Sequence, residues 1–452
     1  MITLSKYLVT VPIEGSSKVI AFSTRTGKVC TISNTVLDKL TKKEVEEIPI
    51  DTLEQLMSNE VVVGEDENEL ETVINQNKAY IEDRTMLYEV IQPTAMCQLG
   101  CGYCGQQHTK DYLQTGAAEK ILERIENRLK SGKYKHLSIG WFGSEPLMGL
   151  DQIRTMTPEL IALAEKYNCG YSSKMVSNGL SLKEPIFLEL VQKWKVQGIE
   201  VTLDGTAEYH DKRRYTKEGL STFDLIFNNL LKILNRPDFK SLGCGISLRC
   251  NVDATNYDSV KPLIHLLAKN NLQDKLSYFY VAPVHKWGND AYLMSLEKEE
   301  FAKLEMEWLL EQFKYGFTQS LLPQRKHQVC ISVTNDSEVF DAFGNVYDCS
   351  ETPLVDSYAN TDYILGNINN GADSISTHRP LLNFYDEVLD GDYPCTKCPM
   401  LPTCGGGCPK SWREGIVACP SPKSNIKDRL LLYYFIKKHG MDALRETVLN
   451  SN

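Results

Sequence analysis

The strongest constraint on the fold is an alternation of strand-like and helix-like segments that begins near residue 88. Apolar, β-branched runs alternate with segments that carry the helical period of about 3.6 residues. Such alternation is typical of parallel βα units. The expected strands are 88–94, 136–142, 171–177, 199–203, 245–252 and 276–281, and the expected helices lie near 116–132, 152–167, 183–195, 222–234 and 258–269.

Six βα units are too few to close an eight-stranded barrel, so we expect an α/β fold built on an open, partial (β/α)6 barrel over residues 86–320. Sheets of this kind carry their chemistry at the C-terminal ends of the strands. Before the barrel, the runs 18–23 and 28–33 flank Thr-Arg-Thr-Gly and predict a hairpin in an N-terminal α+β domain, residues 1–85. The expected helices of this domain lie near 36–40, 52–56 and 68–81.

The C-terminal part, residues 321–452, is rich in loops, cysteines, glycines and prolines, with one clear final helix near 425–438. A segment with so few helices and strands needs an additional source of stability, and bound metal would provide it. We therefore expect a loop-rich metal-binding domain.

Composition excludes some classes of function. Among 452 residues, 59 Asp and Glu outnumber 49 Lys and Arg, and the net charge of -10 leaves no basic footprint for nucleic acid or an anionic membrane. The longest apolar run, 430–436, is far too short to span a bilayer. The first residues lack the basic start and long apolar run of a signal peptide. We expect a cytoplasmic protein that binds neither nucleic acid nor membrane.

Fourteen cysteines are many for such a chain, and most fall into two dense groups, 97–104 and 330–419. Cytosolic thiols stay reduced, so clustered cysteines there bind metal more often than they form disulfides. The isolated cysteines are expected to be small core residues; they are Cys30, Cys169, Cys244 and Cys250.

The first group, Cys97, Cys101 and Cys104, has the spacing C-x3-C-x2-C and follows directly on the first expected barrel strand. Thiolates are soft ligands that suit iron–sulfur clusters or zinc. A closed cluster or a structural zinc site needs four ligands, and this loop offers three, so one metal position stays open. The alternative is a zinc loop with a distant fourth ligand such as His108.

With this triplet at this position, the chain resembles the radical S-adenosylmethionine (SAM) superfamily. The resemblance implies a catalytic [4Fe–4S] cluster whose open iron is chelated by SAM. In that family the cluster reduces SAM to methionine and a 5′-deoxyadenosyl radical, which abstracts a hydrogen atom from the substrate. The cofactor carries the difficult chemistry and the protein positions it.

Further motifs of that family end successive strands. The turn at 142–147 resembles GGEP with a serine in place of the second glycine, and 177–179 resembles TNG. Residues 201–214 resemble S-x-D-G followed by H-D-x-x-R, and arginine suits the SAM carboxylate. The SAM-binding residues implied by this match are Tyr103, Gly143, Ser144, Glu145, Ser177, Asn178, Thr202, Asp204 and Arg214.

The second cysteine group resembles the SPASM extension of radical SAM enzymes, which carries two auxiliary [4Fe–4S] clusters. The resemblance assigns Cys330, Cys349 and Cys408 to the first auxiliary cluster, and Cys395, Cys398, Cys404 and Cys419 to the second. The first is one thiolate short, so we expect an open iron, or ligation by water, His327 or an acidic side chain. The alternative is a pair of zinc sites.

Radical SAM/SPASM proteins mostly modify peptides or proteins, so the resemblance implies a peptide maturase with a precursor peptide as substrate and an electron donor such as flavodoxin or ferredoxin. The reaction would install a thioether or carbon–carbon cross-link or an epimerised residue. The N-terminal domain would hold the precursor by strand addition or act as a cap. Sulfatase maturases place an aspartate base after the cysteine equivalent to Cys349, where this chain has Ser350; Asp348 and Glu351 are nearby candidates.

Two alternatives remain open at this stage. The chain could be a radical SAM enzyme that acts on a whole protein or a small molecule, or a non-catalytic iron–sulfur module that only binds peptide. Cleavage of SAM after reduction separates the enzyme from the module.

Overall fold

The computed structural model describes residues 2–450 and is built around a nine-stranded sheet with the strand order β11-β10-β9-β8-β7-β6-β12-β13-β14. The first six of these strands pair in parallel with their neighbours. They confirm the six expected strands and the expected α/β class. Their bounds are β6 Met86–Ile91, β7 His136–Trp141, β8 Gly170–Ser177, β9 Val196–Thr202, β10 Gly245–Val252 and β11 Tyr278–Pro283.

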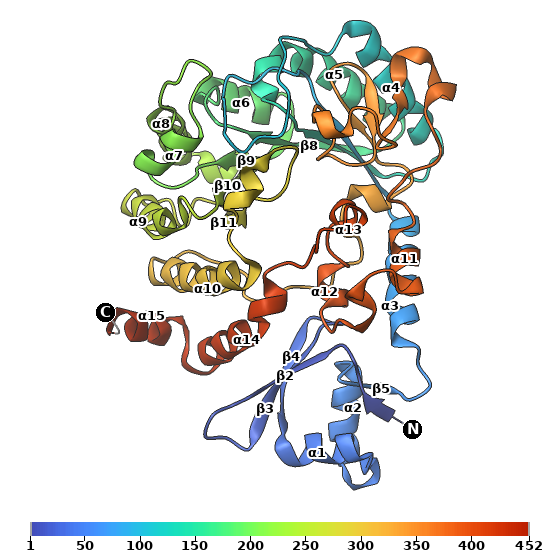
Figure 1. Cartoon of the computed structure of the whole chain (residues 1–452), viewed down its shortest axis with the longest axis vertical. Coiled ribbons are helices and arrows are strands. Elements are labelled where there is room, and N and C mark those ends of the chain that lie inside the picture. The colour runs from blue at the N-terminus through green and yellow to red at the C-terminus, as the bar shows by residue number, and fades with distance from the viewer. Residues whose placement is uncertain (1, 451–452) are drawn as a thin grey trace.

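Helices connect these strands and cover one face of the sheet (Figure 1). The expected helices are present, together with the short helix α7 (Ala207–Arg213), which the sequence did not predict. The connecting helices are α4 Thr115–Leu129, α5 Leu150–Lys166, α6 Glu184–Gln192, α8 Phe223–Leu234 and α9 Val260–Lys269.

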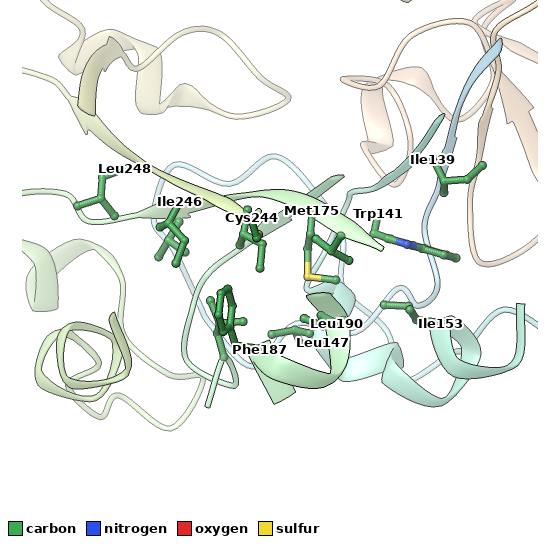
Figure 2. Close-up of a cluster of buried hydrophobic side chains, with 14 of the residues drawn as sticks. Ile139, Trp141, Leu147, Ile153, Met175, Phe187, Leu190, Cys244, Ile246 and Leu248 are labelled. Atoms are coloured by element: carbon green, nitrogen blue, oxygen red, sulfur yellow. The ribbon is translucent and has the colours of Figure 1, made fainter. Parts of the chain in front are cut away.

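The main hydrophobic core lies between the sheet and these helices. Trp141 and Met175 of the sheet face Ile153 of α5 and Leu190 of α6, and all four are almost fully buried (Figure 2). Burying each such side chain contributes about 1.5–3 kcal/mol. This layer holds the strands rigidly, so that the loops at their C-terminal ends have a fixed base.

The sheet continues beyond the six barrel strands into the C-terminal part of the chain. Strand β12 (Val339–Phe340) pairs in parallel with β6, and β13 (Asn345–Tyr347) and β14 (Ile364–Asn367) follow antiparallel. The sequence did not predict this extension, because strands of two to four residues carry no readable alternation. Cys349, two residues after β13, is therefore carried by a strand that is joined to the barrel sheet.

A buried group of charges fastens this junction. Glu338, just before β12, accepts hydrogen bonds from Arg124 (2.6 Å) and Arg379 (2.7 Å) and pairs with Arg128 (2.7 Å). Arg128 also binds Glu89 of β6, and both carboxylates are fully buried. The arginines lower the pKa of Glu338 to about 2, whereas burial raises the pKa of Glu89. Three positive and two negative side chains thus connect α4, β6 and the C-terminal segment.

The N-terminal domain confirms the expected hairpin and adds to it. Strands β3 (Lys18–Ser23) and β4 (Lys28–Ser33) form the hairpin, and β2 (Leu8–Pro12) makes it a three-stranded sheet of order β2-β3-β4. A separate pair joins β1 (Ile2–Leu4) and β5 (Val62–Gly64). The helices of the domain are α1 Asn34–Lys42, α2 Ile50–Ser58 and α3 Glu69–Asp83.

The C-terminal part contains more helix than the sequence predicted. The long helix α14 (Pro422–His439) confirms the expected final helix, but it packs on α10 (Lys298–Lys314), which was not predicted, and on β2 and β3. The last helix, α15 (Met441–Asn450), lies beside α14 and α10 (Figure 1). Short helices carry the cysteine-rich loops; they are α11 Phe384–Asp390, α12 Leu401–Cys404 and α13 Pro409–Arg413.

Candidate active site

A cavity opens at the C-terminal ends of the barrel strands, lined by residues of the loops that follow them. Cys97, Cys101 and Cys104 all line it. This is where the fold brings loops from successive strands together, the usual place of a ligand site in an open α/β sheet.

The loop with the three cysteines is held by backbone hydrogen bonds to the end of α7 and the residues that follow it. The amide of Gly100 donates to the carbonyl of Tyr215 (2.9 Å), and that of Gly102 donates to the carbonyl of Arg213 (3.2 Å). Two donors also face a thiol: the backbone amide of Leu99 lies 3.5 Å and the side-chain amide nitrogen of Asn178 lies 3.8 Å from Cys97 Sγ. Hydrogen bonds to cysteine sulfur stabilise the thiolate form that binds iron.

The turn after β7 has the backbone conformation of the glycine pair that it resembles. Gly143 has φ of 99° and Ser144 has φ of 50°, in the left-handed region that favours glycine. The Ser144 amide donates to Gln106 Oε1 (2.9 Å), while its hydroxyl is buried without a hydrogen-bond partner. A buried polar atom without a partner, beside a cavity, fits contact with a bound molecule.

Glu145 joins the turns after β7 and β8. Its fully buried carboxylate accepts hydrogen bonds from the Asn178 amide (2.7 Å), the Ser177 hydroxyl (2.9 Å) and the Leu147 amide (3.0 Å). Burial raises its pKa and the three donors oppose that rise. Glu145 therefore fixes the relative position of two loops that line the cavity.

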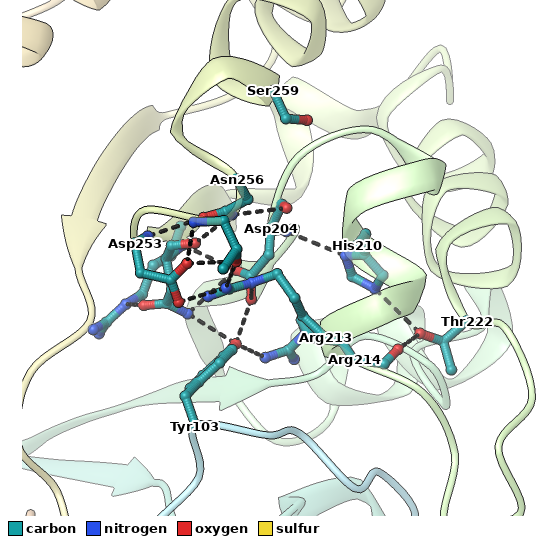
Figure 3. A network of polar contacts seen from close by, with 12 residues as sticks. Tyr103, Asp204, His210, Arg213, Arg214, Thr222, Asp253, Asn256 and Ser259 are labelled. Atoms are coloured by element: carbon teal, nitrogen blue, oxygen red, sulfur yellow. Dashed lines mark hydrogen bonds and ion pairs between the residues drawn. The ribbon is translucent and has the colours of Figure 1, made fainter. Parts of the chain in front are cut away.

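A second polar network orients Tyr103 and Arg214 (Figure 3). The Tyr103 hydroxyl donates to Asp204 Oδ2 (2.5 Å) and accepts from Arg214 (2.6 Å) and from the Asn251 amide (3.1 Å). Asp204 also accepts from the Asn251 backbone amide (2.9 Å). The network thus joins the cysteine loop to β9, α7 and β10.

His210 links Asp204 of this network to Thr222 through hydrogen bonds. Its Nδ1 accepts a hydrogen bond from the Asp204 amide (3.1 Å), so its Nε2 donates to the Thr222 hydroxyl (3.1 Å). The Thr222 hydroxyl in turn donates to the carbonyl of Arg214. Burial and the neighbouring arginines lower the pKa of His210 well below its usual value, so the ring is neutral. Through these bonds, His210 of the H-D-x-x-R segment helps to hold the backbone of Asp204 and Arg214 in place.

The structure brings together most residues that the sequence assigned to SAM. Those that line the cavity are Tyr103, Gly143, Ser144, Ser177, Asn178, Thr202 and Arg214. Glu145 and Asp204 are not among the lining residues, and each supports neighbours that are. His108 also lines the cavity, and burial lowers the pKa of its ring to about 4.

Other lining residues were not predicted. Glu200 of β9 and Arg249 and Asn251 of β10 line the cavity. Residues two apart on a strand share a face, so the position of Glu200 relative to Thr202 was the available signal. His285 and Trp287 lie on the loop after β11, where no periodicity marks them.

A cover formed by two distant loops closes one side of the cavity. The indole nitrogen of Trp287 donates to the carbonyl of Glu351 (2.7 Å), and His285 lies 3.0 Å from the Glu351 carboxylate. All three line the cavity. Of the two acidic neighbours of Cys349, only Glu351 lies in this wall; Asp348 is fully buried and neither of its oxygens has a hydrogen-bond partner.

Gly105 is the contact point between the cysteine loop and this cover. A Cβ at this position would overlap the backbone carbonyl of Trp287. We expect Gly105→Ala to lower the free energy of unfolding by about 1–3 kcal/mol, because backbone rather than a flexible side chain must move. Gly102→Ala is the matched control, since nothing lies within 4 Å of its Cβ. Urea unfolding of both variants checks this, and equal stabilities would contradict the close approach.

The C-terminal cysteines separate into two sites. Four of them line one cavity, and we call this the four-cysteine site; its members are Cys395, Cys398, Cys404 and Cys419. The amide of Gly406 donates to Cys404 Sγ (3.3 Å). Burial and the three neighbouring thiols raise the pKa of Cys395 to about 12.

The remaining cysteines form the three-cysteine site, Cys330, Cys349 and Cys408. Burial and the neighbouring Cys330 and Cys408 raise the pKa of the Cys349 thiol well above its usual value. The Ser332 hydroxyl lies 2.9 Å from Cys330 Sγ. His327, one of the alternatives for a fourth ligand, stacks on Tyr80 with ring centroids 5.1 Å apart.

The donor sets fit iron–sulfur clusters in chemistry and in number. Each site gathers three or four soft thiol ligands, and backbone amides point at the sulfurs of Cys97 and Cys404. Within residues 2–450, no three His, Cys, Asp or Glu side chains converge closely enough to hold a single metal ion. Thiolates of a four-iron cluster each bind a different iron, so they need not converge on one point.

Comparisons with known proteins agree with this geometry. Residues 91–238 match the family model described as the Radical SAM superfamily. In the described part of the chain, no helix is both long and apolar enough to cross a membrane.

Relatives by sequence are distant. A 136-residue stretch is 31% identical to the uncharacterized protein sll1766 of Synechocystis and covers 29% of this chain and 33% of that protein. A longer match is 24% identical over 343 residues to the cysteine-type anaerobic sulfatase-maturating enzyme of Clostridium novyi, covering 71% of this chain and 87% of that enzyme.

The fold is also similar to that of solved structures. Native anSMEcpe with bound AdoMet and the Kp18Cys peptide superposes with a TM-score of 0.56 at 18% identity, covering 80% of this chain and 99% of that chain. At this identity the similarity concerns the fold.

Proposed function

We propose that the chain is an enzyme that uses SAM and an iron–sulfur cluster to remove a hydrogen atom from a carbon of a peptide substrate, because residues 91–238 match the family model of the Radical SAM superfamily. The observation that carries this proposal is that Cys97, Cys101 and Cys104 share one cavity with the strand-end residues expected to bind SAM. When bound, the cluster and SAM supply a carbon radical strong enough to break an unactivated C–H bond.

The protein's own contribution is to hold and orient. Cys97, Cys101 and Cys104 would hold the cluster, and the backbone of Gly143 and Ser144 would approach the SAM amino group. Arg214, held by the Tyr103 hydroxyl (2.6 Å), would bind the SAM carboxylate. Because Asp204 accepts from Tyr103, it positions this arginine without touching the cofactor itself.

The cover formed by Trp287, His285 and Glu351 would exclude water from the reacting carbon. This matters because a strong hydrogen-atom acceptor must meet only its intended substrate. Glu351, which lines the cavity, lies two residues after Cys349 of the three-cysteine site. The cavity and that site are therefore adjacent along the chain. Under the proposal, that site is close enough to accept the electron that a substrate radical loses when a cross-link forms.

We further propose that the three-cysteine and four-cysteine sites hold auxiliary [4Fe–4S] clusters, the first with a non-cysteine or open position, and that flavodoxin or ferredoxin reduces the protein in the cytoplasm. The N-terminal domain would bind the precursor by adding a strand to its sheet. The edge strands of that sheet are β2 and β4, and α14 packs on the β2 side.

The test is anaerobic co-expression with each short open reading frame beside the gene, followed by mass spectrometry of the peptides in ordinary and heavy water. A loss of two hydrogens identifies a cross-link, whether thioether or carbon–carbon. An unchanged mass in ordinary water with deuterium gained in heavy water identifies epimerisation. If every neighbouring peptide stays unaltered while SAM is cleaved, the peptide-maturase proposal fails.

A second candidate is modification of a whole protein, as the name of the sulfatase-maturating relative indicates for that enzyme. Against it, Ser350 follows Cys349 where that class has its aspartate, and the neighbouring Asp348 does not line the cavity. Incubation with a sulfatase-derived peptide distinguishes the two, because the favoured proposal predicts no change in its mass.

A further inference from the structure

Lys423 is the one charged side chain among the residues that line the four-cysteine cavity. It lies on the first turn of α14, and its Nζ is 3.3 Å from Cys419 Sγ. The rest of the wall, apart from the thiols, consists of apolar residues and glycine; these are Pro394, Met400, Leu401, Gly406 and Pro420. Lys423 is therefore the cation that lines this cavity, and Lys326 adds a second positive charge near Cys404.

The charge of Lys423 has no opposite charge close by. Within residues 2–450, no carboxylate forms an ion pair with it. The three-cysteine site differs, because its neighbouring Lys410 pairs with Glu414 (3.5 Å) and also donates to the Tyr358 hydroxyl (2.9 Å). The positive charge of Lys423 at the four-cysteine site therefore has no carboxylate to balance it. The positive charge of Lys410 at the three-cysteine site is balanced by Glu414.

We propose that Lys423 raises the reduction potential of the cluster at the four-cysteine site. The inference rests on the proposed function, because it requires that site to hold an iron–sulfur cluster. Net charge and hydrogen bonds to the sulfurs set the potential of such a cluster. One-electron reduction adds one negative charge, and a cation within hydrogen-bond distance stabilises the reduced form more than the oxidised form.

This difference gives the two C-terminal sites distinct tasks. For an electron released at the cavity, a higher potential at the four-cysteine site would favour its passage to that site from a cluster held at the three-cysteine site. Each transfer oxidises the donor and reduces the acceptor by one electron, with no proton or bond exchanged. The four-cysteine site thereby becomes the end of the internal route, from which an external one-electron acceptor is reduced.

The test is a potentiometric titration of the full-length, reconstituted protein, followed by electron paramagnetic resonance. Lys423→Gln is expected to lower the midpoint potential of one cluster and leave the others unchanged. Lys423→Arg keeps the charge and should retain most of the potential. Lys427→Gln is the matched control, since Lys427 is exposed one turn further along α14 and no contact joins it to the cysteines. Raising the salt concentration should shrink the difference, because the lysine is largely exposed.

The iron content of each variant, read together with its potential, distinguishes failure of this inference from failure of the proposed function. Full iron with an unmoved potential in Lys423→Gln overturns the inference and leaves the proposed function intact. Equal shifts in the glutamine and arginine variants, or loss of about four irons in both, also overturn it, because geometry rather than charge would then be the cause. Absence of iron at the four-cysteine site in the unchanged protein overturns both the inference and the auxiliary-cluster proposal.

Discussion

Replacing Cys97, Cys101 and Cys104 together by alanine is expected to remove about four iron atoms per chain and to abolish SAM cleavage. The three thiols line one cavity, and the other cysteine sites lie on separate loops of the C-terminal part. About eight irons should therefore remain at those sites. Iron analysis and electron paramagnetic resonance of the anaerobically reconstituted protein measure the loss directly.

Isolated cysteines provide the control for this experiment. Cys30 is half-buried in the N-terminal domain, and Cys169 is buried in the barrel, where its thiol lies 3.2 Å from the Tyr134 carbonyl. Cys30→Ala and Cys169→Ala should retain full iron. An iron content unaffected by the triple substitution would mean that the first group holds no cluster, and the catalytic assignment would fall.

Replacing Glu338 by glutamine is expected to lower the free energy of unfolding by about 3–5 kcal/mol. Glu338 is fully buried and faces Arg124, Arg128 and Arg379. Removing its charge leaves three arginines with Glu89 as the remaining carboxylate of the group. At a typical urea dependence, the midpoint should fall by about 1 M or more.

A surface ion pair gives the comparison. Arg154 and Glu189 pair at 2.8 Å, with side chains 41% and 19% exposed. Glu189→Gln should cost less than about 1 kcal/mol, because solvent screens such pairs. If the two substitutions shift urea unfolding equally, the buried charges do not fasten the C-terminal segment to the barrel.

Much of the barrel was predictable because long elements repeat a pattern. The strands β6 to β11 and the helices between them follow hydrophobic periodicity, and that periodicity is imposed by the core around Trp141 and Met175. The turn at Gly143 and Ser144 was predictable as a motif, and its left-handed backbone explains why the motif has glycine there.

The parts that were missed depend on contacts between distant segments. Helix α10 lies between α9 and the C-terminal helices, so its buried residues, such as Phe301 and Trp308, mix with charged ones and blur the pattern. Strand β12 has two residues and exists because β6 offers an edge. Trp287 and Glu351 meet across 64 residues of chain, which no local spacing can indicate.

The measurement that tests the central claim most directly is the formation of 5′-deoxyadenosine from SAM by the reduced, reconstituted protein. The account predicts 5′-deoxyadenosine and methionine from the unchanged protein, and none from the variant in which Cys97, Cys101 and Cys104 are alanine. A protein with its full complement of iron that leaves SAM intact after reduction would contradict the account and would leave an iron–sulfur binding module in place of an enzyme.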